Sequence, residues 1–126
     1  KDGIWLYYNN NNKSVIDLAK NFQELALQTS RAYATTMHGG VSLHHEVEEF
    51  KTVHFYIKKQ DLGWWVQNLQ VQPSTKENAN IVLIPTSDST VFEQCYKLRG
   101  LFVVSDQKLI QDLMANNQKD LAKSLT

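Results

Sequence analysis

The chain has 126 residues, 42% of them hydrophobic, and its 13 basic and 13 acidic side chains give a formal net charge of zero. This length suits one domain with its own core, so we expect residues 1–126 to form a single domain. The charge balance provides no basic field for phosphates and argues against nucleic acid as a partner. Cys95 is the only cysteine, which excludes an intrachain disulfide.

The sequence has no run of about 18 apolar residues, so we expect no membrane span within it. It begins Lys1-Asp2-Gly3 without an initiator Met, which is typical of a mature or excised chain and leaves open a signal peptide or membrane anchor upstream. Asparagine and glutamine together number 20. A surface rich in amides favours an extracytoplasmic bacterial domain, in the periplasm or outside the cell.

The first third of the chain predicts a strand and a long helix. Residues 4–8 are mostly aromatic or β-branched and are followed by four asparagines, a pattern that predicts a strand and a turn. Ser14 is a suitable helix N-cap. A single apolar stripe at the helical period then continues to Met37, so we expect one helix of about six turns. Gly39 and Gly40 would end it.

Three strands are predicted next, over residues 41–47, 52–57 and 64–71. Apolar and polar residues alternate in each of them, as in strands that place one face on a core. Because the connections are short, we expect the three strands to pair as an antiparallel meander.

The second half predicts two further strands and two helices. A polar loop over 73–80 precedes the continuous apolar run 81–84, which is typical of a strand buried on both faces. We expect a helix of two to three turns within 90–100, a strand over 101–104 and a last helix over 105–125. The predicted order is β-α-β-β-β-β-α-β-α. The fold class is therefore α+β, with a mixed, mostly antiparallel sheet, a long N-terminal helix and a C-terminal helix.

The outer face of the predicted meander is the candidate binding surface. Strand parity places Trp65 toward the core and Trp64 on the opposite face. Tryptophan and tyrosine dominate contact hot spots, which favours a binding role for this face. The alternative is that a helix covers the face and buries Trp64. The candidate partner- or ligand-binding residues are Trp64, Tyr56, His54, Asn68 and Gln70.

Metal binding and catalysis have weaker support. His44, Glu46 and His54 would share one face and could form a two-histidine, one-carboxylate set, but a polar strand face explains them equally well. We expect no metal and no cofactor. No motif supplies a nucleophile for His54, and Cys95 falls on the apolar side of its predicted helix, where burial disfavours the thiolate. We therefore predict no catalytic residues and no enzyme.

Two functions remain open. The first is a non-catalytic protein-interaction or assembly domain of a bacterial envelope-associated or secretion-type complex, whose partner is another protein or a second copy of the chain. The second is a small-molecule binding or sensory domain that holds a small apolar ligand in an aromatic pocket between meander and helix. A flat outer face would favour the first function and a concave one the second.

Overall fold

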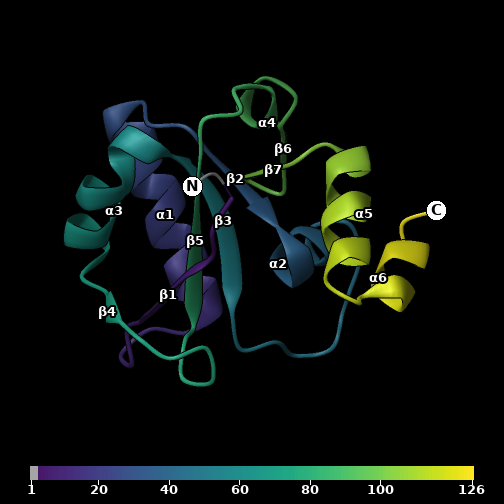
Figure 1. The fold of residues 1–126 in the computed structure, drawn as a ribbon, viewed down its shortest axis with the longest axis horizontal. Coiled ribbons are helices and arrows are strands. Elements are labelled where there is room, and N and C mark those ends of the chain that lie inside the picture. Colours follow the sequence, from purple (N-terminus) through teal and green to yellow (C-terminus); the bar gives the residue numbers. More distant parts are fainter. Residues whose placement is uncertain (1–2) are drawn as a thin grey trace.

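Helices cover both faces of a mixed β-sheet in the computed structural model, which describes residues 3–126 (Figure 1). Within these residues the sheet has seven strands, in the order β4-β1-β5-β3-β2-β7-β6. The strands are β1 (Leu6–Asn9), β2 (Tyr33–Thr36), β3 (Val53–Lys58), β4 (Gln72–Pro73), β5 (Ile81–Thr86), β6 (Tyr96–Leu98) and β7 (Leu101–Val103). The helices are α1 (Val15–Thr29), α2 (Met37–Ser42), the 3-10 helix η1 (Lys59–Asp61), α3 (Leu62–Leu69), α4 (Thr90–Glu93), α5 (Asp106–Ala115) and α6 (Lys119–Lys123). The α+β class predicted from the sequence is confirmed.

Strands β3 and β5 form the centre of the sheet. They pair in parallel from Val53↔Ile81 to Lys58↔Thr86, and every residue of β5 is buried. This confirms that the apolar run 81–84 is a strand with both faces covered. β2 pairs antiparallel with β3 and parallel with β7, so the sheet is mixed. None of the helices in residues 3–126 is long and apolar enough to cross a membrane.

Two hydrophobic cores lie on opposite faces of the sheet. Under α1 and α3, Phe22 stacks on Phe55 and on Trp65, with both pairs of ring centroids 4.0 Å apart. On the other face, Leu109 and Leu113 of α5 belong to the second core. Figure 1 shows α1 and α3 on one side of the strands and α5 and α6 on the other. The predicted core position of Trp65 is confirmed, since its side chain is fully buried.

The predicted six-turn N-terminal helix is wrong in its second half. Ser14 does cap the helix, accepting a hydrogen bond from the Asp17 N–H at 3.1 Å. However, α1 ends at Thr29, because Ser30 takes a left-handed conformation with φ of 57°. Tyr33–Thr36 form the interior strand β2, so Tyr33 belongs to a sheet. The apolar stripe continued past the helix end only because an interior strand is also apolar.

The predicted strand over 41–47 is also wrong. Val41 lies in α2, and residues 43–52 contain no strand. Gly39 and Gly40 lie inside this helix instead of ending one. A Cβ at Gly39 would lie 3.1 Å from Val53, and one at Gly40 would lie 3.0 Å from Leu109. The two glycines therefore allow α2 to pack closely against both layers.

The third strand of the predicted meander, over 64–71, is a helix. Leu62, Trp65 and Leu69 are spaced by three and four residues, which places them on one face of α3. The separation of four residues between Trp65 and Leu69 also fits the period of a strand, which explains why the sequence predicts a strand here. Gln70 ends the helix with φ of 55°. No antiparallel meander therefore forms, and β3 pairs with β5 across the crossover that α3 provides.

The last two predicted helices are both shorter than expected. Only Thr90–Glu93 is helical in the region 90–100, and the chain then forms the hairpin β6–β7. In this hairpin Gly100, with φ of 86°, is a turn residue and not a helix end. The C-terminal helix is divided into α5 and α6 at Asn117, which has φ of 62°. The observed order is thus β-α-β-α-β-α-β-β-α-β-β-α-α, with η1 preceding α3.

Candidate functional site

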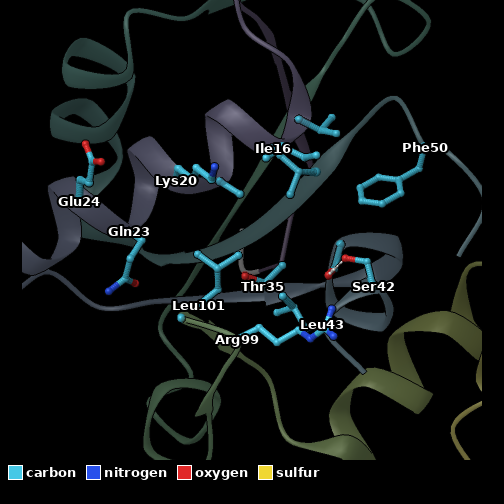
Figure 2. A pocket seen from close by; sticks show the side chains of 15 residues that line it. Ile16, Lys20, Gln23, Glu24, Thr35, Ser42, Leu43, Phe50, Arg99 and Leu101 are labelled. Carbon is cyan, nitrogen blue, oxygen red and sulfur yellow. Dashed lines mark hydrogen bonds between the residues drawn. The ribbon is translucent and has the colours of Figure 1, made fainter. Parts of the chain in front are cut away.

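A cavity of about 420 Å³ lies between the N-terminal part of α1, helix α2 and the turn that joins β6 to β7 (Figure 2). Strands β2 and β3 contribute Thr35 and Val53 to its lining. Its volume falls within the ~300–1,000 Å³ typical of small-molecule sites. We call it the α1 cavity. The lining residues are Val15, Ile16, Ala19, Lys20, Gln23, Glu24, Thr35, Gly39, Ser42, Leu43, Phe50, Val53, Arg99, Gly100 and Leu101.

Apolar side chains make up most of the wall of the α1 cavity. Val15 and Ala19 come from α1, Leu43 and Phe50 from the segment that follows α2, and Leu101 from β7. The Ser14 cap fixes where α1 begins, and residues one turn apart then share a helix face. The wall therefore combines side chains from three parts of the chain that are distant in sequence.

Thr35 is a buried polar residue of this mostly apolar lining. Its side chain is 1% exposed, and its hydroxyl finds no hydrogen-bond partner among the described residues. Leaving a buried hydroxyl unsatisfied costs roughly 1–3 kcal/mol. The oxygen itself is closed to solvent, so a bound molecule would pair with it only after the neighbouring side chains shift.

Charged side chains stand at the rim of the α1 cavity. Lys20 and Glu24 are on α1, and Arg99 is on the β6–β7 turn. Within residues 3–126, neither Lys20 nor Arg99 forms an ion pair. Figure 2 shows Lys20 extending from the helix and Arg99 from the hairpin, with the Arg99 side chain reaching toward Leu43.

Three of the five predicted site residues lie at α3, outside the α1 cavity. Trp64 is half-buried, and the Arg31 guanidinium lies 3.8 Å from the centroid of its ring. The Asn68 amide donates to the Trp64 carbonyl at 2.9 Å, and the exposed Gln70 accepts from the Asn10 amide through its own carbonyl. These three residues share one end of the molecule, and their binding role remains a prediction.

The other two predicted site residues, His54 and Tyr56, lie across the sheet. Both are buried in the layer that contains α5, so the structure does not bring them together with Trp64. His54 packs edge-on against Trp5 at 4.7 Å, and its Nδ1 has no partner among the described residues. Burial, with a smaller contribution from the charge of His38, lowers the pKa of His54 to about 4. The imidazole is therefore neutral at neutral pH.

Tyr56 belongs to a buried polar cluster around Asp112. Its hydroxyl donates to the Asp112 carboxylate at 2.8 Å, and the Thr36 hydroxyl donates to the same oxygen at 2.7 Å. Lys108 lies 3.2 Å from the other oxygen of this carboxylate. The cluster ties α5 to β2 and β3, which gives Tyr56 a structural role.

The residues considered for metal binding and for thiol chemistry are dispersed. His44 lies beside Tyr96 and 3.6 Å from Asp106, and His54 is buried elsewhere; no group of three or more potential ligands occurs in the described part of the chain. Cys95 lies in the turn after α4, not on a helix face. Its thiol donates to the Phe92 carbonyl at 3.0 Å, and partial burial raises its pKa.

Sequence reasoning missed the residues that line the α1 cavity. Thr35 falls within the helix that is predicted up to Met37, and Phe50 lies between the strands predicted over 41–47 and 52–57. One usable signal was the polar Thr29-Ser30 pair, which thinned the apolar stripe before the β-branched Thr35-Thr36 pair. Arg99 carried no local signal, because its role depends on a hairpin that brings it beside α1.

Comparisons with models of protein families, with curated proteins and with solved structures gave no match.

Proposed function

We propose that this protein binds a small organic molecule in the α1 cavity and acts as a non-catalytic binding or sensory domain. This is the second of the two functions that the sequence left open, at a different place from the one expected there. The observation that carries the proposal is a mainly apolar cavity of about 420 Å³, the size of a small-molecule site, between α1, α2 and the β6–β7 turn.

The chemistry of the lining favours binding over catalysis. Small-molecule sites combine mostly apolar walls with a few placed polar groups, and the α1 cavity has this composition. Among its described lining residues, none is a histidine, cysteine or aspartate, and Glu24 is the one carboxylate. Glu24 stands at the rim, and within the described residues no hydrogen bond joins it to a hydroxyl of the lining, so no nucleophile paired with a base is present. Burying apolar ligand surface contributes about 25 cal/mol per Å², which is enough to drive binding without covalent chemistry.

The proposal is tested with a neutral fluorescent probe, 1-anilinonaphthalene, whose emission rises in apolar surroundings. We expect saturable binding to the native protein. Leu101→Trp should fill the α1 cavity and weaken binding at least tenfold, because Leu101 is a half-buried residue of its wall.

Met114→Trp is the matched control. Met114 is 47% exposed on α5, across the sheet from the α1 cavity, so binding should not change. Cooperative urea unfolding of both variants shows that they are folded. If the native protein does not bind the probe, or if folded Leu101→Trp binds it as well as the native protein does, the proposal is wrong.

A second candidate function is association of two copies of the chain at α3. This association is a form of the first function that the sequence left open. The stacking of Arg31 on Trp64 supports it, because tryptophan and arginine are enriched in the hot spots of protein interfaces. Leu27 of α1 is 73% exposed, and it precedes Arg31 by four residues. Two copies would meet without net electrostatic repulsion, because the formal charge is zero.

Sedimentation velocity over a range of concentrations tests this association. Trp64→Ala should weaken a dimer by about 2 kcal/mol or more. Tyr96→Ala removes another exposed aromatic side chain, on β6, and should leave the association unchanged. A native protein that stays monomeric at high concentration would exclude the homodimer.

A further inference from the structure

We infer that the ligand of the α1 cavity is an amphipathic anion, with its apolar body in the cavity and its negative group between Lys20 and Arg99. This inference rests on the proposed function and adds the chemical class of the ligand. It is carried by the charges at the rim and by the backbone conformation that places one of them.

The rim has an excess of positive charge on two separate elements. Lys20 comes from α1 and Arg99 from the β6–β7 turn, and neither is neutralised by an ion pair within the described residues. Glu24 is the carboxylate at this rim and lies one turn after Lys20 on α1. Two cations and one carboxylate leave the rim with one net positive charge. Such a rim attracts an anion, and an adjacent apolar wall excludes water and strengthens the attraction.

The turn that carries Arg99 is unusual for this residue type. Leu98 pairs with Leu101, so Arg99 and Gly100 are the two turn residues of the hairpin. Their φ values are 53° and 86°. A two-residue turn with both φ values positive strongly prefers Asn-Gly, Asp-Gly or Gly-Gly, because a bulky side chain is strained there. Arginine at the first position thus costs stability, and strain of this kind concentrates at functional sites.

The guanidinium is suited to the group that we infer. Arginine presents a planar fork of N–H donors that matches a carboxylate or another oxyanion, and lysine adds a point charge. Leu101 follows the turn directly and belongs to the apolar wall. The same hairpin therefore supplies a cation for the head of the ligand and a contact for its body.

A matched pair of probes tests the charge separately from the cavity. 1-Anilinonaphthalene and its 8-sulfonate have the same apolar body and differ by one negative charge. We expect the sulfonate to bind the native protein about tenfold more tightly at low salt, and the preference to shrink as ionic strength rises. Octanoate should displace the bound sulfonate more effectively than octanol does.

Charge variants give effects of opposite sign. Arg99→Asn removes the cation and keeps a residue that tolerates the turn, so it should reduce the sulfonate preference several-fold, as should Lys20→Gln. Glu24→Gln should increase the preference. Lys119→Gln, on α6, is the control and should have no effect. For each variant, the affinity for the neutral probe should stay unchanged.

The outcomes separate the two proposals. If neither probe binds, the proposed function fails. If the neutral probe binds at the α1 cavity and the sulfonate binds no better, the cavity is a binding site but its ligand is not an anion. A sulfonate preference that survives both Arg99→Asn and Lys20→Gln would also overturn the inference.

Discussion

Thr35 and Thr36 are neighbours in β2, but their hydroxyls lie in different surroundings. The side chain of Thr35 faces the α1 cavity without a hydrogen-bond partner, whereas the Thr36 hydroxyl donates to Asp112 at 2.7 Å. Both are at most 1% exposed. Because successive side chains of a strand point to opposite faces, a single strand supplies one residue to a candidate site and one to a structural cluster.

Substitution of each threonine by valine, which has nearly the same shape, should separate these roles. Thr35→Val removes an unsatisfied buried hydroxyl and should raise the free energy of unfolding by about 1 kcal/mol. Thr36→Val removes a donor from Asp112 and should lower it by ~1–3 kcal/mol. Urea unfolding measures both changes. A large loss of stability in Thr35→Val would mean that its hydroxyl already has a partner.

His54 should make the stability of the protein depend on pH. Burial lowers its pKa from 6.5 to about 4 in the folded chain, so between these values the unfolded state binds more protons. Stability from this residue is therefore complete above about pH 6.5 and is lost as the pH falls through 4. The shift corresponds to an effect on the order of 3 kcal/mol.

The measurement is the free energy of unfolding from pH 7 to pH 4 in the native protein and in His54→Gln. The native protein should lose more stability than the variant over this range. Parallel curves would show that the His54 imidazole is solvated or charged in the folded state.

At the scale of elements, α3 is the clearest case of two periods competing for one segment. The spacing of Leu62, Trp65 and Leu69 fits a helix face, and the fully buried Trp65 stacks on Phe22 of α1. If residues 64–71 formed a strand of the predicted meander, that strand would have to pair with β3. β5 occupies that position, so the helix is the arrangement that buries the indole.

Two glycine-to-alanine substitutions test the backbone conformation of helix α3 and of the β6–β7 turn. Gly63 is in the first turn of α3, and nothing lies within 4 Å of a Cβ built there, so Gly63→Ala should stabilise the protein by about 0.5 kcal/mol. Gly100 also has space for a Cβ, but its φ is 86°, so Gly100→Ala should destabilise by about 1 kcal/mol or more. Thermal unfolding of both variants gives the comparison. A destabilised Gly63→Ala would contradict the helical assignment of 62–69.

At the scale of the whole molecule, the sheet separates two hydrophobic cores, one packed on each of its faces. β3 and β5 are covered on both sides and hold the largest number of buried residues, whereas β4 and β6 are the edges of the sheet. The α1 cavity lies between α1 and α2, and the Asp112 cluster lies in the layer that contains α5. A molecule bound in the α1 cavity would contact β2 and β3, from which Thr36 and Tyr56 reach the Asp112 cluster.

Native-state hydrogen exchange should follow this arrangement. The amides of β3 and β5 should open only with global unfolding and show the highest protection, while those of β4 and β6 should exchange by local opening. Binding of 1-anilinonaphthalene should raise protection in β2 and at the β6–β7 turn. If the amides of β6 were as protected from exchange as those of β5, the edge strand β6 would be covered by another molecule in solution.

Some of this protein could be predicted from sequence because the physical cause is local. The Ser14 cap, the doubly buried run 81–84 and the alternation of Val53, Phe55 and Ile57 each depend on a few adjacent residues and one backbone period. Composition and the mixture of periods were sufficient for the α+β class.

Only the tertiary structure decided the rest. Whether 64–71 became a strand or a helix depended on which surface remained for Trp65 to occupy, and Gly39-Gly40 could be explained only by the close approach of Val53 and Leu109. Thr35, Phe50 and Arg99 are far apart in sequence and meet only because β2, the 43–52 segment and the β6–β7 turn converge beneath α1. A cavity depends on packing between segments that are distant in sequence. The local periods of a sequence do not say which distant segments will pack together.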